Sequence, residues 1–301
     1  MPAKRYSDSA VSAAFPELSG IRHFDAGSYK NVYTVTTGSG REEMLKIAPI
    51  LQDESTDDAR ALRQQEIGRL VRETKVLGSC QSPFVVHLGS ITSSIRQIEG
   101  ESCFVYSEER LPGSSLETVI ELGAGAKPAE AEIKSLLRCL VLGIQALWTS
   151  EHKTVHRDIK PANIFSTRLP DRPYVLIDLG IAYNVTEPGL TVRADHVPHT
   201  PLYMAPEMVD SNFRDTLSYR ADLYAAGVTA FVFATGGVHP LAKRGEGLSK
   251  TYHRIITQEP TRLVAERPDL SPDLCGLVDQ FLKKKPALRP GNFTLILNQL
   301  A

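Results

Sequence analysis

The sequence predicts an α+β fold with two lobes, a small sheet-rich lobe followed by a larger helical one. Strand-like runs dominate residues 21–106, and helical periodicity dominates the chain beyond the break at Leu111-Pro112-Gly113. The chain has 301 residues, of which 42% are apolar. That is enough for one large domain or for two closely packed lobes.

The first lobe is expected to contain several strands and one helix. The β-branched and aromatic run 32–36 and the run 44–47 predict two strands joined by a Gly-rich turn, and 103–106 predicts another. Between them, apolar residues recur at helical spacing over 67–77, after an acidic and polar connection at 53–60. Residues 1–20 show no strong period and are expected to form a loosely held extension.

The second lobe is expected to be helical. After Pro128, one apolar face is formed by Ile133, Leu136, Leu137, Leu140, Val141, Ile144 and Leu147. Further helical segments are predicted over 222–235 and 273–285. We therefore expect an N-terminal extension over 1–20, an N-lobe over 21–111 and a C-lobe over 112–301. Ligand sites favour the cleft between such lobes.

Charge and composition exclude several classes of protein. The 34 Lys and Arg residues nearly balance the 35 Asp and Glu residues, and the sequence pI is near 6.7, so neither a nucleic acid nor a membrane is expected as a partner. The longest apolar run, 225–234, is shorter than the roughly 20 residues that a membrane span needs. No signal peptide is visible in residues 1–14, and a cytoplasmic location is expected. The oligomeric state remains open.

The cysteines indicate neither a zinc site nor a disulfide framework. The four residues lie far apart in the sequence and form no CxxC pair: Cys80, Cys103, Cys139 and Cys275. Buried free thiols in a reducing compartment are the expected state.

The most informative stretch is His156-Arg157-Asp158-Ile159-Lys160-Pro161-Ala162-Asn163-Ile164. It places an acid, an ammonium and an amide within one short turn. The apolar run 174–177 follows and ends at Asp178-Leu179-Gly180. Two carboxylates, a lysine and an asparagine on neighbouring loops can hold divalent metals and polyphosphate while removing a proton from a hydroxyl.

These segments resemble the catalytic loop and the metal-binding turn of the protein kinase family, and the resemblance extends from Ile21 to the C-terminus. It implies a bilobal protein-kinase-like fold and an ATP- and Mg²⁺-dependent kinase that phosphorylates Ser or Thr on a protein substrate and could also phosphorylate itself. In this reading Asp158 is the base, Lys160 steadies the transferring phosphate, and Thr200 bridges the two. A lysine at position 160 is typical of serine/threonine kinases.

The resemblance also implies the metal and phosphate ligands. Asn163 and Asp178 would bind Mg²⁺, which prefers hard oxygen ligands and takes several from phosphate and water. Lys46, in the middle of a predicted strand, would contact the α- and β-phosphates. A buried lysine needs a carboxylate partner. Glu73 on the following helix is the expected partner, with Glu66 as the alternative.

The phosphate-covering loop is the weakest match to the family. The family form is G-x-G-x-x-G-x-V, and in the stretch 25–32 only Gly27 and Val32 survive. This departure would suit a divergent, bacterial or viral-like member.

Further along the chain, the carbonyl of Glu109 and the backbone of Leu111 would bond adenine, and Phe165 would form the floor of its pocket. Glu108 then occupies a position that is normally apolar or Thr.

The end of the activation segment is represented by Thr200-Pro201-Leu202-Tyr203-Met204-Ala205-Pro206-Glu207. By resemblance, Glu207 pairs with Arg289, and Asp222 anchors the backbone of the catalytic loop. Arg157 would pair with a phosphorylated residue of the segment 181–199. The candidates are Thr186 and Thr191, unless Asp195 or Glu187 already supplies the charge.

Two other functions compete with this interpretation. A pseudokinase, acting as a nucleotide- or protein-binding module, is favoured by the degraded loop and by the polar Glu108. A kinase of small molecules is disfavoured by the Ala205-Pro206-Glu207 end, which indicates a ledge for a peptide. Transfer of labelled phosphate would separate the first rival from an active kinase.

Overall fold

The computed structural model describes residues 4–26, 30–52, 55–179, 183–184, 201–209, 217–243 and 245–301. They form two compact units. The first takes its residues from 1–79 and 86–111, and the second from 80–85, 112–188 and 199–301. Residues 80–85 therefore cluster with the second unit, although they precede the expected start of the C-lobe.

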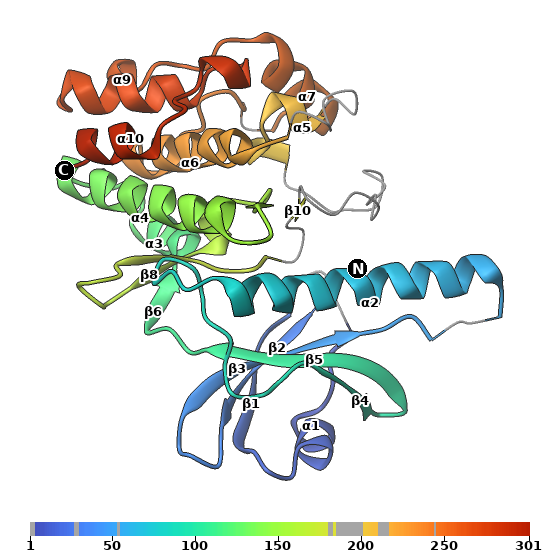
Figure 1. Ribbon diagram of the computed structural model, residues 1–301. Helices are drawn as coiled ribbons and strands as arrows, with labels where there is room; N and C mark the ends of the chain where they lie inside the picture. The colour runs from blue at the N-terminus through green and yellow to red at the C-terminus, as the bar shows by residue number, and fades with distance from the viewer. Residues whose placement is uncertain are drawn as a thin grey trace. The chain divides into compact units, whose positions relative to one another are not determined.

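The first unit is built on a five-stranded antiparallel sheet in the order β1-β2-β3-β5-β4 (Figure 1). The three predicted strands lie within this sheet, whereas the outer strands were not predicted. The strand bounds are β1 (Ser19–Ala26), β2 (Asn31–Thr36), β3 (Glu42–Pro49), β4 (Ser94–Ile98) and β5 (Glu101–Glu109).

The two faces of this sheet are different because successive side chains of a strand point to opposite sides. Leu45, Ile47 and Val105 belong to an apolar cluster that includes residues of helix α1 (Asp8–Ala14). Lys46 and Tyr106, which alternate with them, carry polar atoms towards helix α2 (Asp57–Ser79). The two helices lie on opposite sides of the sheet (Figure 1).

The N-terminal segment is part of this apolar core, so the expectation of a loosely held extension is wrong. Tyr6, Val11 and Phe15 are fully buried against β2, β3 and β5. Burial of side chains of this size contributes roughly 1.5–3 kcal/mol each. The helix α1 is only seven residues long, too short for its periodicity to stand out in the sequence.

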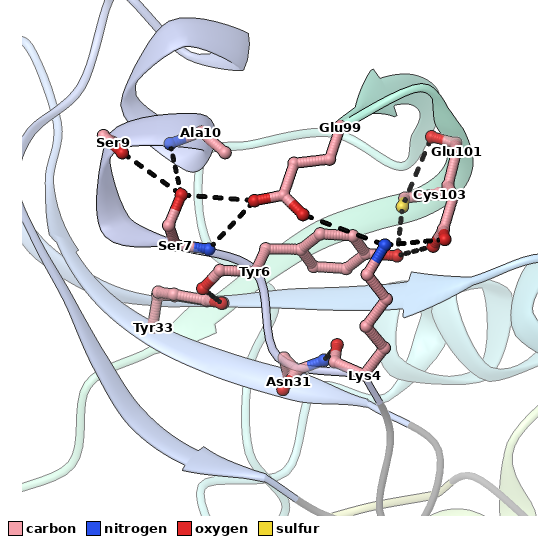
Figure 2. A network of polar contacts seen from close by, with 10 residues as sticks. All are labelled: Lys4, Tyr6, Ser7, Ser9, Ala10, Asn31, Tyr33, Glu99, Glu101 and Cys103. Atoms are coloured by element: carbon pink, nitrogen blue, oxygen red, sulfur yellow. Dashed lines mark hydrogen bonds and ion pairs between the residues drawn. The ribbon is translucent and has the colours of Figure 1, made fainter.

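Polar contacts also hold the segment in place (Figure 2). The Tyr6 hydroxyl donates to a carboxylate oxygen of Glu101 at 2.8 Å, and Lys4 Nζ lies 2.7 Å from the other oxygen. The Asn31 side chain donates to the Lys4 carbonyl oxygen at 2.6 Å. The Ser7 hydroxyl accepts a hydrogen bond from the Ala10 amide and caps helix α1. The segment is thereby tied to the start of β2 and to β5.

Helix α2 contains the predicted helical stretch and begins ten residues earlier, at Asp57. Part of the connection expected at 53–60 thus forms its first turn, where Asp57 and Asp58 are favourably placed near the positive end of the helix dipole. The face turned to the sheet buries Leu70, Glu73, Thr74, Val76 and Leu77. Glu73 is the charged residue among these five.

The second unit is mainly helical. The expected α+β fold, with a sheet-rich part followed by a helical part, is therefore confirmed. In α4 (Glu130–Thr149) the seven predicted core residues are all buried, and α4 packs beside α6 (Tyr219–Ala234) (Figure 1). Helix α6 is buried from Ala221 to Ala234. The helices are α3 (Leu116–Leu122), α4 (Glu130–Thr149), α5 (Pro206–Val209), α6 (Tyr219–Ala234), α7 (Leu248–Thr257), α8 (Leu263–Glu266), α9 (Pro272–Phe281) and α10 (Phe293–Gln299).

Two small sheets and short 3₁₀ turns complete this unit. Strands β6 (Gly113–Ser115), β8 (Ile164–Thr167) and β9 (Tyr174–Leu176) form one sheet, and β7 (Thr154–Val155) pairs with β10 (Tyr183–Asn184). Gly113 has φ +123°, and a Cβ there would lie 2.0 Å from the Ser166 carbonyl oxygen, so only glycine fits. The 3₁₀ turns are η1 (Pro161–Asn163), η3 (Pro201–Tyr203) and η5 (Pro286–Leu288).

Two expectations from composition can be checked in the described part of the chain. All four cysteines are buried free thiols, as predicted. No helix among the described residues is long and apolar enough to cross a membrane.

Candidate active site

The catalytic-loop candidates of the second unit lie together. Asp158 precedes η1, and its Oδ2 atom accepts from Lys160 Nζ at 2.9 Å and from Asn163 Nδ2 at 2.7 Å. Asn163 Nδ2 also donates to the Asp158 carbonyl oxygen at 2.9 Å. The Asp158 and Lys160 side chains are each 19% exposed, so both are oriented by neighbours and still open to a reactant. This grouping is the one that the sequence predicted.

A buried carboxylate holds the backbone of this loop. Arg157 has φ +71°, in the left-handed region that non-glycine residues seldom adopt and that costs on the order of 1–3 kcal/mol. Asp222 is 1% exposed and accepts from the amides of His156 and Arg157 at 2.8 and 2.9 Å. Burial raises the pKa of Asp222, and the nearby His156 and these amides oppose the rise. The predicted anchoring role of Asp222 is confirmed.

The β8–β9 hairpin brings the two expected metal ligands near each other. Ile164 pairs with Leu176, and the Ile177 amide donates to the Asn163 carbonyl oxygen at 3.0 Å, so Asp178 follows directly after the point of contact. Asp178 has φ +62°. Because Asn163 uses its amide nitrogen for Asp158, its side-chain oxygen is the atom suited to a cation.

The donor set fits Mg²⁺. An amide oxygen and a carboxylate are hard ligands, and this ion is usually held by few protein groups together with phosphate and water. Within the described ranges, no cluster of three or more His, Cys, Asp or Glu side chains could enclose a metal by itself. A magnesium ion at Asn163 and Asp178 would therefore take its remaining oxygen ligands from phosphate and water.

In the first unit, the lysines and glutamates pair differently from the prediction. Lys46 Nζ lies 2.6 Å from Oε1 of Glu108, whereas both oxygens of Glu73 lie 2.6 Å from Lys30 Nζ. Glu66 accepts from the Leu51 amide at 3.0 Å. The prediction that Lys46 pairs with Glu73, or with Glu66, is therefore wrong.

The sheet register explains this exchange of partners. Lys46 pairs across the strands with Tyr106, and Glu108 lies two residues further along β5, on the same face. A diagonal pair of this kind is within reach of long side chains. Glu73 instead receives Lys30, which precedes β2, and the Tyr106 hydroxyl at 2.9 Å.

We call Lys30, Lys46, Glu73, Tyr106 and Glu108 the buried charge cluster. Burial raises the pKa of Glu108, and the charge and hydrogen bond of Lys46 oppose the rise. The two ammonium groups lie 5.6 and 5.8 Å from the Tyr106 ring centroid, at cation–π distance. The carboxylate at a position that is normally apolar is thus neutralised from the neighbouring strand.

The remaining expected nucleotide contacts stay predictions. Val32 lies in β2 opposite Lys46, and Phe165 lies in β8 opposite Val175. Glu109 ends β5, where its side chain accepts from the His87 amide at 2.9 Å, and Leu111 is 9% exposed. Several predicted residues fall outside the described part of the chain: Gly27, Thr186, Glu187, Thr191, Asp195 and Thr200.

The predicted structural ion pair of the second unit is confirmed. Arg289 donates to both carboxylate oxygens of Glu207, at 2.5 and 2.8 Å, and both side chains are buried. The same guanidinium donates to three backbone carbonyl oxygens. This arrangement supports the fold and not the chemistry.

Sequence reasoning missed two charged residues of the first unit. Glu43 is buried, and hydrogen bonds from Ser107 and Ser90 lower its pKa although burial pushes it upward. Lys30 lies in the stretch 25–32, at a position where the family form has glycine. A lysine at a glycine position of a phosphate-covering loop was the signal that could have revealed its role.

Comparisons with known proteins agree with this geometry. The family described as "Protein kinase domain" matches residues 22–300. The chain is 35% identical over 150 residues to the "Dual specificity mitogen-activated protein kinase kinase mek-1" of Caenorhabditis elegans, covering 49% of this chain and 39% of that protein.

Two further relatives match more of the chain. It is 26% identical to the "Serine/threonine-protein kinase ATG1a" of Arabidopsis thaliana, over 77% of this chain and 34% of the relative. It is 27% identical to the "Serine/threonine-protein kinase ULK3" of Xenopus laevis, over 88% of this chain and 51% of the relative. The chain thus spans about a third to a half of the lengths of these relatives.

Proposed function

This chain belongs to the protein kinase domain family, and we propose that it transfers the γ-phosphoryl group of ATP to a Ser or Thr hydroxyl of a protein. The observation that supports this proposal best is the position of Asp158. Its carboxylate accepts from Lys160 and Asn163 in a loop whose strained backbone is bonded to Asp222.

Each residue of this group has a distinct role. Asp158 orients the substrate hydroxyl and accepts its proton, while the Lys160 ammonium offsets negative charge on the phosphoryl group that is transferred. Asn163 and Asp178 would hold Mg²⁺, which would offset part of the negative charge of the phosphates. Asp222 holds the backbone of the loop and Asn163 donates to the carboxylate of Asp158, so that this group does not have to reorient during the reaction.

The choice of substrate follows from the same loop. Lys160 favours serine and threonine, although one relative is named as a dual-specificity kinase, so tyrosine is a second acceptor to be assayed. We also propose that the chain phosphorylates itself at Thr186 or Thr191, with Arg157 as the partner of the new phosphate. Intact-mass measurement before and after incubation with ATP tests this, and an unmodified, fully active chain would remove the idea.

A non-catalytic, nucleotide-binding role is the competing function. The pairing of Lys46 with Glu108 favours it, because the lysine expected to contact phosphate has a different partner. The loop of Asp158, Lys160 and Asn163 opposes it, since a protein without turnover has no use for a positioned base.

Phosphate transfer decides between the two functions. Asp158→Asn is expected to lower transfer of labelled γ-phosphate to a generic protein substrate by roughly 100-fold or more, the usual contribution of a general base. Asp171→Asn, at an exposed turn between β8 and β9, is the matched control and should transfer as the wild type does. Transfer by Asp158→Asn at the wild-type rate, or no transfer by the wild type, would contradict the proposal.

A further inference from the structure

We propose that Lys30, and not Lys46, is the lysine of the first unit that contacts the nucleotide phosphates, with Glu73 as its positioning residue. Lys46 and Glu108 then form a structural pair. This assignment rests on the proposed function. It differs from what the family resemblance implies, because the resemblance places Lys46 at the phosphates and leaves position 30 to glycine.

The first argument is the way in which Glu73 is bonded. Its side chain is 1% exposed, and both of its oxygens lie 2.6 Å from Lys30 Nζ. The Tyr106 hydroxyl donates to Oε1 at 2.9 Å, while it accepts from Lys30 at 3.1 Å. A helix carboxylate that binds one ammonium through both oxygens fixes the direction of that lysine. In this protein that lysine is Lys30.

The second argument is the engagement of Lys46. Its Nζ lies 2.6 Å from Glu108, and the two side chains are 10% and 5% exposed. Among the described residues, Lys46 is the hydrogen-bond partner of the Glu108 carboxylate, whereas Glu73 also has Tyr106. Drawing Lys46 away to a phosphate would leave a buried carboxylate uncompensated, which is strongly unfavourable.

The third argument is the origin of Lys30. It lies within the stretch 25–32, which resembles the phosphate-covering loop, so its side chain starts from the segment expected to lie over the phosphates. The next residue, Asn31, is fully buried, pairs with Ile47 of β3 and donates to the Lys4 carbonyl oxygen (Figure 2). The backbone beside Lys30 is thus fixed from two sides, and its ammonium can be placed reproducibly.

Exposure alone does not distinguish the two lysines. The Lys30 side chain is 12% exposed and the Lys46 side chain 10% exposed. Both ammonium groups also lie at similar distances from the Tyr106 ring. The difference lies in the carboxylate that each lysine meets and in the segment from which each side chain starts.

The test compares the affinity for MgADP with that for adenosine, which has no phosphate, by titration calorimetry. The two pairs are removed as matched doubles, Lys30→Met/Glu73→Met and Lys46→Met/Glu108→Met, so that neither variant buries a lone charge. A charge-assisted contact to phosphate accounts for roughly 10- to 150-fold in affinity. We expect the first double to lower the preference for ADP over adenosine by at least about tenfold, and the second by less than about threefold.

Circular dichroism on heating shows whether each variant folds. If the first double unfolds at a much lower temperature, Lys30→Gln provides the same comparison, because an amide keeps a donor for Glu73. Loss of the ADP preference in the Lys46/Glu108 double and its retention in the Lys30 variants would overturn the assignment. Equal losses in both would also overturn it.

The wild-type chain shows whether the proposed function itself holds, independently of the role of Lys30. A wild-type chain that binds MgADP and transfers phosphate, but whose ADP preference does not depend on Lys30, would refute only the role of Lys30. A wild-type chain that binds neither MgADP nor adenosine and transfers no phosphate would overturn the proposed function and this assignment together.

Discussion

The buried pair of Glu207 and Arg289 allows a quantitative prediction about the stability of the second unit. Every N–H of the Arg289 guanidinium has an acceptor: two bonds go to Glu207, and three go to the backbone carbonyl oxygens of Lys283, Lys284 and Arg220. The guanidinium also lies 4.9 Å from the Tyr224 ring centroid. Its charge has no access to water, since the side chain is 0% exposed.

Glu207→Gln keeps the shape of the side chain and removes its charge. Arg289 then stays buried with three neutral carbonyl oxygens and without a counter-ion. Breaking one partner of such a pair typically costs about 3–5 kcal/mol. For a unit of this size that corresponds to a fall of roughly 6–20 °C in the unfolding midpoint.

The single tryptophan of the chain reports on the unit concerned. Trp148 lies in α4 with its ring centroid 5.2 Å from that of Tyr219. Its fluorescence in a urea titration should show the loss for Glu207→Gln. Arg262→Gln is the control, because Arg262 is 74% exposed in its ion pair with Asp279 and such a pair contributes less than about 1 kcal/mol. A loss for Glu207→Gln no larger than that of the control would refute the reasoning.

Three further outcomes are expected. Burial lowers the pKa of His239 from 6.5 to about 4, and its Nδ1 accepts from two backbone amides, so the unfolded state binds more protons between these values. The free energy of unfolding should therefore fall by about 3 kcal/mol from pH 6.5 to 4. In urea titrations, His239→Gln should flatten this dependence on pH, whereas the exposed His253→Gln should not. An unchanged dependence in both variants would contradict the role given to His239. Tyr6→Ala should lower the free energy of unfolding by about 3–5 kcal/mol. Tyr6→Phe, which loses the bond to Glu101 and the acceptor for Cys103 Sγ, should lower it by about 1.5–3 kcal/mol. A Tyr6→Ala variant as stable as the wild type would show that the N-terminal segment adds nothing. Asp222→Asn leaves one buried backbone amide of the loop without an acceptor. It should lower the free energy of unfolding by about 1–3 kcal/mol and slow phosphate transfer. Unchanged transfer would mean that the loop keeps its shape without this anchor.

The sequence predicted correctly the features that depend on residues close together in the chain. Asp158, Lys160 and Asn163 lie within six positions of one another, so a single turn brings their side chains together. The apolar face of α4 was equally readable, because periodicity over twenty residues is a strong signal. The anchoring of the loop by Asp222 and the pairing of Glu207 with Arg289 were long-range contacts that the family resemblance supplied.

Sequence reasoning failed where contacts depend on partners far apart in the chain. The N-terminal helix has seven residues, too few to be stable alone, and it is stabilised by tertiary contacts that include its apolar cluster with residues of β2, β3 and β5. The outer strands β1 and β4 were missed for a related reason, since a strand with one exposed face and one neighbour carries a weak pattern.

The sequence by itself determined which residues are candidates for the chemistry, because the acid, the ammonium and the oxygens proposed to bind a metal are contiguous or follow one hairpin. It also presented Lys46, Glu73 and Glu108 as candidate charges, to which the structure added Lys30. Which lysine meets which carboxylate was decided only by the tertiary structure. The register of β3 against β5 brings Glu108 to Lys46, and the packing of α2 against the sheet brings Glu73 to Lys30. A buried ion pair forms with whichever partner lies within hydrogen-bond distance, and that distance is a property of the assembled sheet and helix.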